Sequence, residues 1–131
     1  MRKITKVWLQ AAHEDCLMAQ KAMEIKLYRQ VCFHSQQCAE KGLKAVILEK
    51  GKKLRKVHDL LELSKDIEDL PLQVPVSIEE LDFLNRVYRS RYPPDIGLLP
   101  HGEPMKGDAQ KALEIAQRIF TQVGKILERK A

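Results

Sequence analysis

The sequence is poor in the residues that strands, membrane spans and disulfide frameworks need. Aromatic residues make up 5% of the chain, and glycine and proline number six each. A chain with so few strand-favouring aromatics and so few helix breakers favours helix. It has no run of about 18 apolar residues, so we expect no membrane span. Charges interrupt the N-terminal stretch MRKITKVWLQAAHEDC, which excludes a signal peptide and predicts a cytoplasmic protein.

Cysteine is also scarce. Cys16, Cys32 and Cys38 are odd in number and lack CxxC spacing. This pattern predicts neither a disulfide scaffold nor a zinc site, but small buried side chains in a reducing compartment. His13, beside Glu14 and Asp15, has no second ligand at helical spacing, so we expect no metal and no cofactor.

What the chain does contain is typical of one globular domain over residues 1–131. Apolar residues make up 44% and charged residues 31% of the chain, and the net charge is +5. The one dense basic run, KGKKLRK at 50–56, has two interpretations. It is either a solvated loop between helices or a loop that faces phosphate.

Apolar residues recur at helical spacing in five stretches. The first helix is predicted from Thr5, as N-cap, to about residue 27, and the second over 29–50, before Gly51. A short third helix is predicted over 58–70. Ser77 and Glu80 form a capping box for a fourth helix, which must end before Pro93.

The last helix is predicted from Asp108 to about residue 129. The preceding segment, 92–107, holds four of the six prolines and three of the six glycines. It is predicted to be a long irregular loop, and such loops are often functional. The fold class is therefore all-α: an antiparallel up-and-down bundle of four main helices plus one short helix.

Four segments, taken in order, are similar to one family. They are WLQAAHEDCLMAQKAM, YRQVCFHSQQCAEKGLKAVILEKG, HDLLEL and LDFLNRVYRSRYPPD. Together they resemble the HEPN domain, a helical bundle named for proposed nucleotide binding. The resemblance covers nearly the whole chain.

The resemblance implies a homodimer and two kinds of activity. Many HEPN domains are metal-independent ribonucleases that use an Arg and a His a few residues apart. Here nine residues separate Arg91 from His101, so the ribonuclease motif is absent in its usual form. Other relatives form a two-protein module with a small nucleotidyltransferase. That role does not need the Arg–His pair, so we expect a binding module in a toxin–antitoxin-like pair, which would engage a nucleotide or RNA. An endoribonuclease using Arg91 and His101 and a purely structural adaptor are the alternatives.

The second predicted helix has an unusual polar face. Gln36, Glu40 and Lys44 are spaced i, i+4 and i+8, and Gln37 lies one position around. A Glu40–Lys44 pair would stabilise the helix by about 0.3–0.5 kcal/mol. Because Gln36 also lies on the apolar stripe, its amide needs a partner, for which Trp8, Asp15 and Tyr88 are candidates. The face is a buried network, a ligand or partner surface, or a solvated surface.

Arginines gather near the end of the fourth predicted helix. Arg86, Arg89 and Arg91 would complement the helix dipole there, or clamp a phosphate through their forked donors. Tyr92 could stack on a base beside such a clamp. His34 and His58 are interpreted as an idle surface residue and a helix-start residue. Arg91 and Tyr92 are the leading candidates for a ligand site, with Arg86, Gln37, Glu40 and Lys44 beside them.

Overall fold

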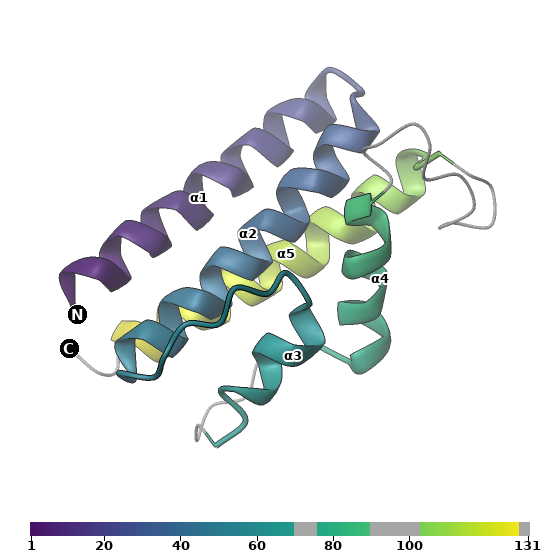
Figure 1. The fold of residues 1–131 in the computed structure, drawn as a ribbon. Helices are drawn as coiled ribbons and strands as arrows, with labels where there is room; N and C mark the ends of the chain where they lie inside the picture. Colours follow the sequence, from purple (N-terminus) through teal and green to yellow (C-terminus); the bar gives the residue numbers. More distant parts are fainter. Residues whose placement is uncertain (70–75, 90–102, 129–131) are drawn as a thin grey trace.

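A computed structural model describes residues 1–69, 76–89 and 103–128 of the chain. It contains five helices: α1 (Lys3–Glu24), α2 (Tyr28–Glu49), α3 (Leu60–Lys65), α4 (Ile78–Arg89) and α5 (Lys106–Glu128). The described ranges contain no strand. The three long helices α1, α2 and α5 run alongside one another, and α3 and α4 lie on one side of them (Figure 1). The predicted all-α bundle of four main helices and one short one is confirmed.

The core forms along α2, which packs against every other helix. The apolar stripe of α2, which consists of Cys32, Gln36, Ala39, Leu43, Val46 and Ile47, is buried. Leu84 and Val87 of α4 and Ile115, Ile119 and Val123 of α5 fill the space against it. Gly51 follows α2 with φ of 75°, a conformation in which a side chain would be strained, as expected for a helix C-terminus. Gln36, Glu40 and Lys44, which form the polar face of α2, are buried in the bundle as well.

The helix ends follow the sequence closely at α4 and less closely elsewhere. At α4, the backbone N–H of Glu80 donates to Ser77 Oγ and the N–H of Ser77 donates to Glu80 Oε1, which confirms the capping box. α3 is shorter than predicted, because Asp59 caps it by accepting from the N–H of Leu61 and the chain leaves the helix after Lys65.

The N-cap predicted at Thr5 was wrong, and α5 begins two residues before the predicted start at Asp108. Thr5 lies inside α1, where its buried hydroxyl donates to Glu49 of α2 at 2.8 Å, so it ties two helices together. Asp108 lies in the first turn of α5 and accepts from the backbone N–H of Met105 at 2.8 Å. A carboxylate three residues into a helix can bond back to the N-cap N–H, so α5 begins at Lys106.

Candidate functional site

The most polar part of the interior lies on α2, where it faces α3 and α4. Gln36, Glu40 and Lys44 stack one turn apart, and their exposed fractions are 0%, 3% and 6%. Apolar neighbours surround them, since Ala39, Leu43 and Ile47 are buried on the same helix. A carboxylate and an ammonium at such depth are stable only when they are paired and hydrogen-bonded.

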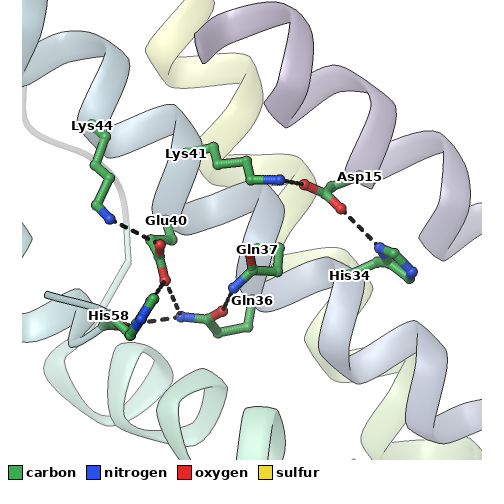
Figure 2. Close-up of polar contacts among 8 residues, drawn as sticks. All are labelled: Asp15, His34, Gln36, Gln37, Glu40, Lys41, Lys44 and His58. Carbon is green, nitrogen blue, oxygen red and sulfur yellow. Dashed lines mark hydrogen bonds and ion pairs between the residues drawn. The ribbon is translucent and has the colours of Figure 1, made fainter. Parts of the chain in front are cut away.

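Glu40 is the centre of this network, as Figure 2 shows. Lys44 Nζ donates to its Oε2 at 3.0 Å, and Gln36 Nε2 donates to its Oε1 at 3.2 Å. His58 Nδ1 lies 3.0 Å from the same Oε1. Because Glu40 is paired with an ammonium and can only accept, Nδ1 of His58 carries the proton. The buried carboxylate therefore fixes one tautomer of an imidazole whose side chain is 67% exposed.

Gln36 joins the network to the chain that follows α2. Its Nε2 also donates to the backbone carbonyl of His58 at 3.1 Å, and its Oε1 accepts from Gln37 Nε2 at 2.8 Å. The prediction of a buried, hydrogen-bonded Gln36 is confirmed. Its expected partners Trp8, Asp15 and Tyr88 were wrong, since the bonds go to residues 37, 40 and 58 instead. The Glu40–Lys44 pair is present, but it is buried rather than solvated.

A second carboxylate is held in the same way where α1 meets α2. Asp15 is 8% exposed, and its two oxygens lie 2.8 Å from His34 Nδ1 and 2.7 Å from Lys41 Nζ. Each trio thus has one buried acid, one lysine and one histidine, and Figure 2 shows that α2 contributes residues to both of them. The interpretation of His34 as idle was wrong, because His34 pairs with Asp15. The sequence could not reveal this pair, since Asp15 lies on α1 and His34 on α2.

A small pocket opens beside the Glu40 network. It has a volume of about 260 Å³ and is lined by His58, Asp59, Asn85 and Tyr88. Asn85 Nδ2 donates to Asp59 Oδ1 at 2.9 Å, and Asn85 Oδ1 accepts from the N–H of Leu60 at 3.0 Å. These bonds fasten the start of α3 to α4, so the pocket has a fixed wall.

Four aromatic rings, those of His34, Phe33, Tyr88 and His58, lie next to one another in that order. The ring centroids of His34 and Phe33 are 4.9 Å apart, those of Phe33 and Tyr88 are 5.8 Å apart, and those of Tyr88 and His58 are 6.1 Å apart. The planes of Phe33 and Tyr88 differ by 22° and those of Tyr88 and His58 by 24°. We call these four residues the aromatic row. It was not predicted, because its members come from α2, α4 and the segment before α3.

The remaining predicted site residues separate into two groups. Arg86 pairs with Asp82 one turn earlier on α4 at 3.2 Å, and its side chain is 45% exposed, so it remains accessible. The side chain of Gln37 is half-buried beside Gln36. Arg91, Tyr92 and His101 lie outside the described residues. Residues 92–102 of the predicted 92–107 loop, which include Leu98 and Leu99, also lie outside them.

The three cysteines are free and buried, as predicted. Cys16 of α1 and Cys38 of α2 belong to one small buried cluster with Ala116. A hydrogen bond from Cys38 lowers the pKa of Cys16 to about 7, while the same bond and burial raise the pKa of Cys38. Burial raises the pKa of Cys32 to about 12. Cys32 is therefore an unreactive core residue at neutral pH.

Among the described residues, no group of three or more His, Cys, Asp or Glu side chains is arranged to hold a metal ion. None of the helices in those ranges is long and apolar enough to cross a bilayer.

The chain is similar over nearly its whole length to several known proteins. The chain is 28% identical over 140 residues to the Methanocaldococcus jannaschii protein named "Putative toxin MJ1304", with 98% of this chain and 91% of that protein covered. The solved structure of TT1696 from Thermus thermophilus has a TM-score of 0.71 and 26% identity, covering 95% of this chain and 99% of that one. ST0689, an archaeal HEPN homologue, has a TM-score of 0.67 and 26% identity, covering 96% and 99%. The sequence model of the HEPN domain family matches residues 5–127, and the chain therefore belongs to that family.

Proposed function

We propose that this chain is the HEPN component of a toxin–antitoxin-like pair, in which a small nucleotidyltransferase is its partner protein. The observation that carries the proposal is the similarity, over 98% of the chain, to a protein whose name describes a toxin. The family match supports it as well, since it spans residues 5–127.

The ligand that we propose for this module is a nucleotide or RNA. The net charge of +5 attracts phosphate, and the basic residues 52, 53, 55 and 56 are exposed in the segment between α2 and α3. Arg55 in that segment is paired with Asp66 at 2.9 Å, but Lys53 and Lys56 form no ion pair with any residue in the described ranges. These two lysines are the accessible charges for phosphate contact.

Controlled expression in a bacterial host tests the toxin–antitoxin proposal. We expect growth to stop when this chain is expressed alone and to resume when the nucleotidyltransferase encoded nearest to its own gene is expressed with it. The two proteins should also co-purify when only one carries an affinity tag. Normal growth combined with no co-purification would refute the proposal.

We also propose that the module is a homodimer. Val7 and Met18 on α1 and Ile25 directly after it have exposed fractions of 62%, 52% and 65%, and Met105 before α5 is 60% exposed. Exposed apolar residues that lie along one helix often belong to an interface. Size-exclusion chromatography with light scattering should give twice the monomer mass. A monomer mass at high protein concentration would contradict the proposal.

RNA cleavage is the second candidate function, and one observation favours it. His58 Nδ1 is bound by the buried carboxylate of Glu40, and the ring is largely exposed at a pocket. A carboxylate that orients an accessible imidazole is the usual arrangement of a general base. His58→Gln should then abolish cleavage of RNA in the presence of EDTA. His13→Gln, which changes an exposed histidine beside Phe120, should leave cleavage unchanged.

A further inference from the structure

Two of the three cysteines meet where α1 packs against α2. Cys16 of α1 and Cys38 of α2 are 6% and 0% exposed, and with Ala116 of α5 they form a small buried cluster apart from the main core. The thiol of Cys38 donates a hydrogen bond to Cys16. Two sulfurs in contact, held there by the packing of two long helices, are the starting arrangement that a disulfide needs.

The two thiols differ in reactivity. The hydrogen bond from Cys38 lowers the pKa of Cys16 to about 7, and Gln20 Nε2, which lies 3.7 Å from Cys16 Sγ, donates a second bond that also lowers it. A large fraction of Cys16 is therefore thiolate at neutral pH, and the thiolate is the nucleophilic form. The same bond and burial raise the pKa of Cys38, so Cys38 keeps its proton. Cys16 is thus the sulfur that reacts first.

The cluster also lies close to the surface of the bundle. Gln20, which bonds to Cys16, is exposed one turn further along α1. The half-buried ring of Phe120 packs against the cluster, and Phe120 together with His13 lines a surface pocket of about 390 Å³. One aromatic residue thus borders both the thiols and the pocket. A small oxidant therefore reaches Cys16 more readily than it reaches Cys32, which is 0% exposed in the main core.

We propose that Cys16 and Cys38 are a redox modification site, at which hydrogen peroxide generates a reversible disulfide that joins α1 to α2. This inference requires neither the partner protein nor the ligand of the proposed function. In a reducing compartment such a disulfide is transient, and transient disulfides are typical of redox sensing.

The reaction takes place in two steps. The Cys16 thiolate attacks one oxygen of the peroxide, so that an S–O bond forms, the O–O bond breaks and hydroxide leaves, and Cys16 becomes a sulfenic acid. The Cys38 sulfur then attacks the Cys16 sulfur. An S–S bond forms, the S–O bond breaks, and the departing hydroxide takes the proton of Cys38 to give water. In total, two thiols are oxidised to one disulfide and one hydrogen peroxide is reduced to two waters.

Peptide mapping of the full chain tests the site. The folded protein is treated with hydrogen peroxide, catalase removes the excess, and the remaining thiols are alkylated with iodoacetamide in urea before digestion with trypsin. Cys16 lies in the tryptic peptide 7–21, and Cys32 and Cys38 both lie in the peptide 30–41. Mass spectrometry should find these two peptides joined, with Cys32 alkylated. Dithiothreitol should separate them.

Three variants assign the roles of the sulfurs. Cys32→Ala keeps both thiols of the site and should form the disulfide as wild type does. Cys38→Ser keeps a hydrogen-bond donor beside Cys16 but no second sulfur, so the sulfenic acid should persist on Cys16 and react with dimedone. Cys16→Ser should form no disulfide with Cys38 and give no dimedone adduct on Cys38. Circular dichroism establishes that each variant is folded.

Oxidation of the protein unfolded in urea is the matched control, and there Cys32 should react as well, because the selectivity for Cys16 and Cys38 comes from the fold. The same mixture of products from folded and unfolded protein would overturn the proposal. So would three cysteines that all remain alkylated after peroxide treatment, or a Cys16 sulfinic acid without any disulfide. A disulfide between two chains, seen as a dimer on a non-reducing gel in place of the joined peptides of one chain, would refute it too.

Discussion

Removing the Glu40 carboxylate should be the most destabilising single change in the polar face of α2. In Glu40→Leu the Lys44 ammonium, whose side chain is 7% exposed, loses its partner at 3.0 Å. Gln36 and His58 each lose a hydrogen bond as well. Breaking a buried ion pair by removing one partner costs about 3–5 kcal/mol, because an uncompensated charge stays buried. This is a large share of the free energy of unfolding of a typical domain, about 5–15 kcal/mol.

Urea denaturation followed by circular dichroism measures this loss. The matched control is Asp82→Ala, which removes the acid of another i, i+4 pair, with Arg86, whose side chains are 53% and 45% exposed. A surface pair of this kind contributes about 0.3–0.5 kcal/mol. Lys44 Nζ also lies 5.6 Å from the centre of the Trp8 ring, so Trp8 fluorescence should change in Glu40→Leu. If the two variants unfolded at the same urea concentration, the network would not be a stabilising element.

Gln36→Leu should cost about 1–3 kcal/mol, since it leaves the His58 carbonyl without its buried donor; Gln37→Leu should cost less, and equal urea midpoints would contradict this. Ser77→Ala should lower stability by about 1 kcal/mol in thermal denaturation, because it removes the hydroxyl that caps α4. The hydrogen bond from Arg118 lowers the pKa of Glu80, so its stabilisation is present above the ordinary glutamate pKa of about 4.3 and is lost as pH falls through the lower folded value. The melting-temperature difference between wild type and Arg118→Gln should therefore shrink below about pH 4.3, and a difference that grew there would show that the sign is wrong.

The sequence predicted the features that depend on one helix at a time. The stripe on α2, the Gly51 terminus and the capping box at Ser77 each follow from spacing within one segment, and each is present. Helix starts were less predictable where a polar side chain had a competing partner. Thr5 is an example, because its hydroxyl bonds across to Glu49 instead of capping its own helix.

The site could be predicted only in part for the same reason. The polar face with Gln36, Glu40 and Lys44 was visible as a pattern of i and i+4 residues. Its link to His58 was not, because 17 residues lie between Glu40 and His58 and include a reversal of the chain. Phe33 and Tyr88 also come together only through the packing of α2 against α4. Only the folded arrangement reveals such contacts.

The bonds from Gln36 and Glu40 to His58 also have a consequence for the order in which the protein unfolds. They join α2 to the segment that carries α3, which in turn is fastened to α4 through Asn85. Opening of α3 and α4 requires this link to break together with the contacts of Leu60, Leu63, Leu84 and Val87, which belong to the buried core. Native-state hydrogen exchange should show amides of α3 and α4 opening at lower free energy than those of α2. The polar face of α2 therefore contributes to the free energy that holds α3 and α4 against the rest of the bundle.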